Sequence, residues 1–356
     1  KELALSDILS YNDFKLKIGM DISQIAHSGG VANYTLNLSQ ELIKIKDLEF
    51  KFFYSSLRKP YSGNLPNVKS FPIPPTLLEK LFNQLRIVGI DKFIGKVDVF
   101  HSSDWTQPKS NAKKVTTYHD VIPLKFPQLY HPKIVDVHKK RLALVEQEID
   151  MIICVSNSTK KDLLEVSQIP EEKITVIYEG VGREFKPQDD NLVKEFKNKY
   201  QLPDNYVLAI GGIGERRNLK RVKEAAKKYQ LLISGQTLPI IPGDELPFLY
   251  CGARVLLYPS FYEGFGLPIL EAMACGVPVI TSSVSSMPEV GGDAAEYVNP
   301  ESVLDIENKL RQVLEDKDKR KQMIKKGLIQ AKKFSWQKCA EETAEVYRRL
   351  INEDLD

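Results

Sequence analysis

Two carboxylates flank a glycine turn in the segment PSFYEGFGLPILEAMACGVPVI, residues 259–280. Glu263 lies on the turn, and Glu271 follows eight positions later, about one turn into a predicted helix. The apolar run ARVLLYPS before the turn is typical of a strand. Pro268 suits the start of the helix, where its missing N–H costs nothing. With a further buried strand over Val277–Thr281, the segment predicts a unit of strand, glycine turn, helix and strand.

The chemistry of this unit favours a ligand that carries both phosphate and hydroxyl groups. Glycines let the backbone approach a ligand closely, and free N–H groups at a helix start attract phosphate. Carboxylates beside a phosphate are unfavourable unless they accept hydrogen bonds from hydroxyls. A diphosphate with a polyol at each end, as in a nucleotide sugar, satisfies both requirements. The alternative is an ordinary strand–helix crossover with two solvated glutamates.

Two further glycine-containing loops follow predicted strands. The stretch GGIGERRNL, residues 211–219, places Arg216 and Arg217 after the glycines, and arginine offers planar donors to phosphate oxygens. Adjacent arginines on a loop are otherwise solvated surface. The stretch HSGGVANYTLNLSQEL, residues 27–42, contains Gly29 and Gly30 before a helical pattern, with a plain strand–helix turn as the alternative.

Histidines offer a third set of candidates. His119 directly follows a strand in TTYHD, which makes it an active-site candidate, although a lone histidine at such a point is more often structural. His101, after DVF, is a weaker candidate for lining an acceptor site. Asp316-Lys317-Asp318 matches a metal-binding DxD pattern only by letter, and we interpret it as solvated surface. With five histidines and no His/Cys cluster, no metal site is expected.

Composition indicates an ordinary globular protein with no nucleic-acid partner. The 356 residues suffice for two domains, and the net charge of +3 is too balanced to favour nucleic acid. No apolar run approaches the roughly 20 residues that span a bilayer, and the first residues lack a secretory apolar segment. The four cysteines are dispersed, which suits reduced thiols. We therefore expect a cytoplasmic protein.

The order of predicted strands and helices indicates the α/β class, with two doubly wound, Rossmann-like domains facing each other across a crevice. The charged stretch VGREFKPQDDN interrupts this order. We therefore predict an N-terminal domain over residues 1–183, a nucleotide-sugar-binding domain over 184–335, and a last helix over 336–356 that packs back on the first domain. Residues 77–94 are amphipathic and predict a core helix, with a membrane-surface helix as the alternative.

The motifs together resemble glycosyltransferase family 4, a family of retaining enzymes with the GT-B fold, from about Lys15 to the C-terminus. The resemblance implies that Glu271 holds the ribose hydroxyls of the donor. It also implies that Glu263 and the N–H groups of the turn hold the transferred sugar, and that the N-terminal domain is the acceptor side. The donor-binding positions implied in this way are Gly29, Gly30, Gly212, Arg216, Arg217, Gly264, Phe265, Gly266, Leu267 and Glu271. The catalytic candidates are Glu263, His119, Arg216 and Arg217.

The chain departs from the family pattern in two places. Arg217 stands where the family carries lysine, so charge is kept while geometry changes. Between LLISG and LPFLYCGA the family carries another helix and strand, whereas here only QTLPIIPGDE remains, near residues 235–245. Either a strand–helix unit is missing from the C-terminal domain, or a segment is absent from the sequence.

The resemblance implies retaining transfer of a hexose from a nucleotide diphosphate sugar to an acceptor hydroxyl, by a front-face reaction without a metal or other cofactor. The similarity of the segments HDVIPL and YEGFGLP to the family favours GDP-mannose as the donor, with UDP-sugars as alternatives. The acceptor (glycan, lipid-linked sugar or protein) stays open, as does peripheral contact with the inner face of a membrane. Rival interpretations are a nucleotide-sugar epimerase of similar fold and a non-catalytic partner subunit.

Overall fold

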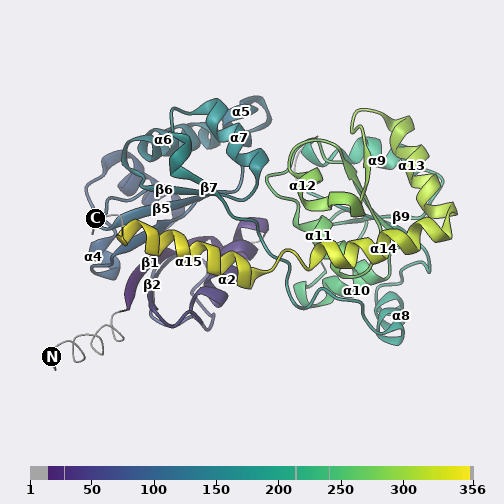
Figure 1. The fold of residues 1–356 in the computed structure, drawn as a ribbon, viewed down its shortest axis with the longest axis horizontal. Coiled ribbons are helices and arrows are strands. Elements are labelled where there is room, and N and C mark those ends of the chain that lie inside the picture. The colour runs from purple at the N-terminus through teal and green to yellow at the C-terminus, as the bar shows by residue number, and fades with distance from the viewer. Residues whose placement is uncertain (1–14, 28, 213–214, 240, 353–356) are drawn as a thin grey trace, which may run out of the picture. The chain divides into compact units, whose positions relative to one another are not determined.

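The computed structural model describes residues 15–27, 29–212, 215–239 and 241–352. These residues form two compact units, each built around its own parallel sheet (Figure 1). The first unit contains the chain up to Cys154, Leu164–Ile177 and the residues from Gln337 onward. The second contains Val155–Leu163 and Tyr178–Trp336. The boundary predicted between residues 183 and 184 falls in the loop that opens the second unit's long segment.

The sheet of the first unit has seven parallel strands in the order β3-β2-β1-β4-β5-β6-β7. Its strands are β1 (Leu16–Asp21), β2 (Leu48–Ser55), β3 (Val68–Phe71), β4 (Val99–Ser102), β5 (Lys113–Tyr118), β6 (Met151–Cys154) and β7 (Ile174–Val176). Apolar runs such as MIIC are buried throughout, as a sheet covered on both faces requires. The strand order reverses between β1 and β4, where ligands bind in doubly wound sheets.

Helices cover both faces of this sheet. They are α2 (Gly30–Leu42), α5 (Ile122–Lys125), α6 (Pro132–Glu148), α7 (Asn157–Val166, which continues from the second unit) and α15 (Trp336–Asn352). The last of these lies along the sheet (yellow in Figure 1). Tyr347 of α15 bonds to the His101 ring at 2.7 Å, and Arg348 pairs with Asp47. These contacts hold the C-terminal helix on the first unit.

The prediction of one helix over residues 77–94 is wrong. The segment forms α3 (Pro75–Glu79), continues as a wider π-helical turn over Lys80–Leu85, and ends where Arg86 adopts a φ of +51°. A separate short helix, α4 (Asp91–Ile94), follows. The assignment of this segment to the core is confirmed, because Leu78, Phe82, Ile90 and Ile94 are all buried in one apolar cluster.

The second unit has five parallel strands in the order β12-β11-β10-β8-β9. They are β8 (Val207–Ile210), β9 (Leu231–Ser234), β10 (Val255–Tyr258), β11 (Val279–Ser282) and β12 (Glu296–Val298). The covering helices are α8 (Asp190–Lys199), α9 (Leu219–Ala225), α10 (Leu246–Cys251), α11 (Leu267–Ala274), α12 (Met287–Gly291), α13 (Val303–Glu315) and α14 (Lys317–Ala331). Here the order reverses between β8 and β10.

The short stretch near residues 235–245 explains why β9 lies at the edge of this sheet. In the first unit a third strand pairs outside β2, whereas the described residues between Ser234 and Leu246 form a turn and one 3-10 turn, Gly243–Glu245. The second sheet therefore lacks a counterpart of β3 in the described part of the chain.

The Asp316-Lys317-Asp318 stretch has a structural role, because the Asp316 carboxylate caps the start of α14.

Candidate active site

The glycine turn after β10 has the local structure that the sequence predicts. Gly266 adopts a φ of +112° immediately before α11, a conformation that only glycine reaches without strain. Leu267 opens the helix, Glu271 lies one turn inside it, and Gly276 (φ +74°) follows its end. The turn therefore delivers two carboxylates and a helix start to the same edge of the second sheet.

Side-chain hydroxyls hold the three carbonyl oxygens of residues 263–265. The bonds run from Ser285 and Ser286 to the Glu263 carbonyl (2.6 and 2.9 Å), from Ser156 and Thr159 to the Gly264 carbonyl (2.6 and 3.1 Å), and from Ser286 to the Phe265 carbonyl (2.6 Å). In a trans peptide the carbonyl and the following N–H point in opposite directions. The N–H groups of Gly264, Phe265 and Gly266 are therefore turned away from these hydroxyls, and no acceptor among the described residues bonds to them.

The Phe265 side chain belongs to the core of the domain. Its ring packs against Tyr178 and Phe334, with centroids 6.0 and 5.9 Å away, and the residue is buried. What Phe265 offers a ligand is therefore its backbone N–H, as the sequence interpretation of the turn requires.

Both arginines converge on Glu263. The Glu263 carboxylate is buried, with its side chain 6% exposed; Arg216 Nη1 bonds to its Oε2, and Arg217 Nη1 lies 2.9 Å from Oε1. The contact of Arg217 is a charge pair without hydrogen-bond geometry. Glu263 Oε1 and the Nε and Nη1 of Arg217 consequently have no hydrogen-bond partner among the described residues. Buried polar groups are normally bonded, so this cluster has unused donors and one unused acceptor.

Neighbouring residues fix the position of the Arg217 guanidinium. It lies over the Tyr258 ring at 4.7 Å from the centroid, the stacking that a planar guanidinium allows and an ammonium does not. A Cβ at Gly212 would approach Arg217 Cγ to 3.1 Å, so glycine there leaves room for the arginine stem. Burial lowers the Arg217 pKa, which the nearby Glu263 carboxylate opposes. Tyr258 and Gly212 thus accommodate an arginine at position 217, where the family carries lysine.

Glu271 is held by a residue that the sequence did not single out. Tyr250 of α10 donates a hydrogen bond of 2.6 Å to Glu271 Oε2. Burial raises the pKa of the Glu271 carboxyl to about 7, while the Tyr250 bond and the charge of Arg217 act in the opposite direction. This carboxyl therefore changes charge near neutral pH.

In the first unit, His119 follows β5 and is partly buried. Its ring meets the edge of Tyr34 at 4.6 Å between centroids, and it lines a hollow of about 160 Å³ together with Asp104, His138 and Arg141. Gly29 and Gly30 stand at the start of α2, with open space where a Cβ would be, and Gly29 has a φ of +119°. All three lie at the carboxyl edge of the first sheet.

The suggestion that His101 lines an acceptor site is wrong. The residue is 2% exposed, its Nδ1 bonds to Tyr347 at 2.7 Å, and its Nε2 bonds to Thr117 at 2.9 Å. Burial lowers the His101 pKa to about 3, so the ring stays neutral. His101 is a satisfied core histidine that ties α15 to the sheet.

The arrangement in the second unit suits an anion flanked by hydroxyl groups. The arginine loop follows β8 and the glycine turn follows β10, so both lie where the strand order reverses; the Phe261 N–H bonds to the Arg216 carbonyl at 2.9 Å and joins them. No three His, Cys, Asp or Glu side chains gather to hold a metal within the described ranges. The donor-binding roles and the expectation of no cofactor stay predictions.

Sequence reasoning missed the residues that support this site. Tyr250 and Tyr258 lie in apolar stretches that read as core, and the hydroxyls of Ser156, Thr159, Ser285 and Ser286 come from distant parts of the chain. The SSVSSMP stretch, dense in serine directly after β11, was the one available signal. It indicated hydroxyl donors without indicating the carbonyls that they hold.

Comparison with known proteins yields two family models that match overlapping parts of the chain. "Glycosyltransferase Family 4" matches residues 28–185, and "Glycosyl transferases group 1" matches residues 159–329. The chain is 33% identical over 284 residues to O-antigen chain mannosyltransferase B of Escherichia coli, covering 71% of this chain and 74% of that protein. It is 28% identical over 291 residues to the serotype-specific mannosyltransferase WbdA of Escherichia coli, spanning 70% of this chain but only 36% of that protein.

Solved structures show the same fold. Sucrose-phosphate synthase from Thermosynechococcus elongatus superposes with a TM-score of 0.78 at 20% identity, covering 95% of this chain and all of that one. WaaG, a glycosyltransferase involved in lipopolysaccharide biosynthesis, gives a TM-score of 0.71 at 15% identity over 93% of this chain and 99% of that one. These likenesses confirm the predicted GT-B fold class. Helices long and apolar enough for a membrane span are absent from the described residues.

Proposed function

Because this chain belongs to glycosyltransferase family 4, we propose that it transfers mannose from GDP-mannose to an acceptor hydroxyl with retention of the anomeric configuration. Glycosyl transfer follows from the family; the donor, the stereochemistry and the independence from metal are the proposal. Mannosyltransferases among the relatives, O-antigen chain mannosyltransferase B and WbdA, support the choice of sugar.

The observation that carries the proposal is the convergence of Arg216 and Arg217 on Glu263, the residue that precedes the turn with the N–H groups of residues 264–266. Breaking the glycosidic bond leaves negative charge on the departing diphosphate, and prepositioned donors stabilise such charge in the transition state. Arg217 has two N–H groups without hydrogen-bond partners among the described residues, and the turn supplies several more. Two guanidinium cations and a helix start at Leu267 can then neutralise the diphosphate without Mg²⁺.

Glu263 and Glu271 take separate roles in this proposal. Glu263 is engaged by both arginines, so it is poorly placed to act as a free nucleophile. It binds a hydroxyl of the transferred sugar through Oε1, which has no hydrogen-bond partner among the described residues, and it orients the guanidinium groups. Glu271, supported by Tyr250, accepts hydrogen bonds from the ribose hydroxyls. With both glutamates engaged in binding, the incoming hydroxyl attacks from the face of the leaving group and transfers its proton to the donor's own phosphate.

In the first unit, the family resemblance gives His119 a role near the anomeric carbon of the transferred sugar. The His119 ring is held by its edge contact with Tyr34. The same resemblance gives Gly29 and Gly30, at the start of α2, a role in binding the diphosphate through their backbone N–H groups. Both assignments rest on the resemblance to the family.

A panel of nucleotide sugars tests this proposal. The purified protein is incubated with GDP-mannose, UDP-glucose and UDP-N-acetylglucosamine, each with a mixture of mannoside acceptors, and nucleoside diphosphate release is measured. We expect GDP release from GDP-mannose that depends on the acceptor. Interconversion of the sugar without an acceptor would indicate an epimerase instead. No release from any donor would indicate a non-catalytic subunit.

A further inference from the structure

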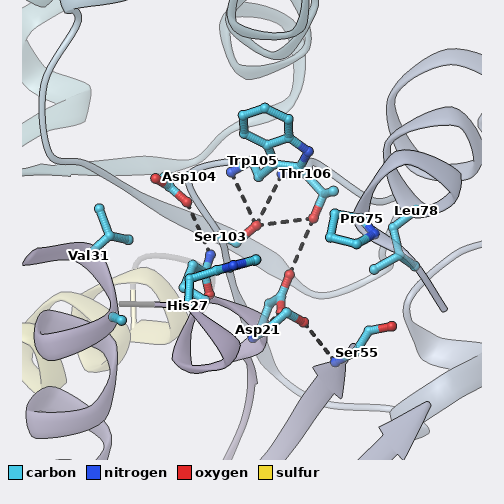
Figure 2. A pocket seen from close by; sticks show the side chains of 13 residues that line it. Asp21, His27, Val31, Ser55, Pro75, Leu78, Ser103, Asp104, Trp105 and Thr106 are labelled. Carbon is cyan, nitrogen blue, oxygen red and sulfur yellow. Dashed lines mark hydrogen bonds between the residues drawn. The ribbon is translucent and has the colours of Figure 1, made fainter. Parts of the chain in front are cut away.

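A cavity of about 370 Å³ opens at the carboxyl edge of the first sheet, where the strand order reverses (Figure 2). β1 ends there in Asp21, and β4 leads there into the loop Ser103–Thr106. Ligands of doubly wound sheets bind at this point, and the volume falls at the small end of the roughly 300–1,000 Å³ typical of ligand sites. None of the donor-site residues of the second unit contributes to its wall.

The lining of the cavity combines apolar walls with oxygen-bearing side chains. Val31, Ala32, Pro75, Leu78 and Trp105 provide apolar surface. Two carboxylates, Asp21 and Asp104, accompany the hydroxyls of the serines and threonine, and no lysine or arginine is among the described lining residues. A phosphate would meet the like charge of these two carboxylates, and the His27 imidazole is the one basic side chain among the described lining residues. An uncharged sugar, with apolar ring faces and a rim of hydroxyls, matches both kinds of surface.

The cavity floor is held in place by its own hydrogen bonds. Asp21 Oδ1 accepts the N–H and hydroxyl of Ser23 at 2.9 and 2.6 Å, and its Oδ2 accepts the Thr106 hydroxyl at 3.3 Å. Ser103 Oγ accepts the N–H groups of Trp105 and Thr106 at 3.3 and 3.1 Å. Figure 2 shows this network below the Trp105 indole. The loop that carries Asp104 and Trp105 is therefore preorganised for a ligand.

Two buried polar atoms of the wall have no partner in the described part of the chain. They are the indole N–H of Trp105, a donor, and the Oε1 of Gln24, an acceptor. The Nε2 of Gln24 is already used, donating to Asp104 at 3.2 Å. A small rotation of either side chain toward the cavity would let a hydroxyl bond to it. A hydroxyl both donates and accepts, so it complements such a pair.

The cavity borders the hollow that contains His119. Val31 and Asp104 line both spaces, and the shared wall belongs entirely to the first unit. A sugar in the cavity therefore has one side next to the histidine that the family resemblance places near the anomeric carbon. This is where a nucleophilic hydroxyl has to be.

We propose that this cavity binds the terminal, uncharged pyranose of the acceptor, with Trp105 covering its apolar face and Asp104 accepting its hydroxyls. The inference rests on the proposed glycosyl transfer and adds the acceptor class: a neutral glycan end, rather than a phosphorylated sugar or a lipid phosphate. Asp21 anchors the loop through Thr106 and forms the floor.

Binding of defined probes tests the assignment. The protein, saturated with GDP, is titrated by calorimetry with methyl α-mannobioside and, separately, with mannose 6-phosphate and farnesyl phosphate. We expect the neutral mannobioside to bind and both phosphates to bind at least tenfold more weakly. Absence of mannobioside binding, or tighter binding of either phosphate, would overturn the proposal.

Variants assign the binding to this cavity. Trp105→Ala should weaken mannobioside binding at least tenfold, Trp105→Phe should weaken it less because an apolar face remains, and Asp104→Asn should weaken it severalfold. The matched control is Asp98→Asn, which removes a carboxylate at the opposite end of β4, where Asp98 accepts the Lys17 N–H. Mannobioside affinity at wild-type level in both Trp105 variants would refute the assignment.

A separate GDP titration distinguishes failure of this inference from failure of the proposed function. The GDP affinity of all four variants should equal that of the wild type, because none of the substituted residues is assigned to the nucleotide. Wild-type protein that turns over GDP-mannose while the Trp105 variants keep their acceptor affinity would remove only the cavity assignment. Wild-type protein that binds no nucleotide would remove the proposed function itself.

Discussion

Replacement of Arg217 by alanine should weaken GDP binding by about two orders of magnitude. The Nε and Nη1 groups of Arg217 have no hydrogen-bond partner among the described residues, and the guanidinium is held over Tyr258. Two charge-assisted hydrogen bonds to phosphate contribute about 1.5–3 kcal/mol each, and we take the lower figure because Glu263 competes for the same cation. The sum of about 3 kcal/mol corresponds to roughly 100-fold, at about 1.4 kcal/mol per tenfold.

Arg217→Lys should lose about half of this binding free energy, which corresponds to a roughly tenfold lower affinity for GDP. The reason is that lysine keeps the charge but neither the stacking on Tyr258 nor the second aligned donor. Calorimetric titration with GDP at two salt concentrations measures both variants, because an ionic contribution weakens as salt screens it. The matched control is Arg221→Ala. Arg221 also lies over a ring, that of Phe261 at 5.3 Å, but among the described residues it bonds to the carbonyl of Glu301 and the side chain of Asn218 alone. If Arg217→Ala binds GDP as tightly as Arg221→Ala does, the diphosphate site is misassigned.

Four further predictions concern the carboxylates and the absence of a metal. Glu263→Gln should lower kcat by several tens-fold, because a sugar hydroxyl loses a charged acceptor with a contribution of about 1.5–3 kcal/mol; turnover at the wild-type rate would exclude Glu263 from the sugar site. The Glu271 carboxyl, with its pKa raised to about 7, is ionised above and neutral below that pH, so GDP-mannose affinity should fall as pH drops from 8 to 6 and become nearly pH-independent in Glu271→Gln. Tyr250→Phe should move the midpoint of that pH profile upward, since the Tyr250 hydrogen bond favours the ionised carboxylate; an unmoved midpoint would show that Tyr250 only packs. Turnover should persist in EDTA, and abolition that Mg²⁺ or Mn²⁺ restores would contradict the metal-free mechanism.

The parts of the site that follow local rules were predictable from the sequence. Local sequence alone determines where α11 begins and ends. The structure has the glycine before Leu267, the carboxylate one turn into the helix and the glycine after its end at the predicted positions. The same holds for the doubly wound order of strands, because apolar runs alternate with amphipathic stretches along the chain.

Features that depend on contacts between distant residues were not predictable. The helix expected over residues 77–94 breaks at Arg86, where Nη1 bonds to the Phe82 and Gln107 carbonyls and Nη2 pairs with Glu148. In the sequence, His101 resembles a site histidine. In the structure its Nδ1 bonds to the hydroxyl of Tyr347, which is 246 residues away along the chain. The support of Glu271 by Tyr250 likewise depends on how α10 packs beside α11, which periodicity alone does not determine.

The stereochemistry of the product tests the proposed reaction most directly. The protein is incubated with GDP-mannose labelled with ¹³C at the anomeric carbon and with methyl α-mannobioside, and the product is examined by NMR. Because the mannosyl group of GDP-mannose is α-linked, retention predicts an α-mannoside, formed together with one GDP per transfer. A β-mannoside, or GDP release with free mannose as the sole sugar product, would contradict retaining transfer.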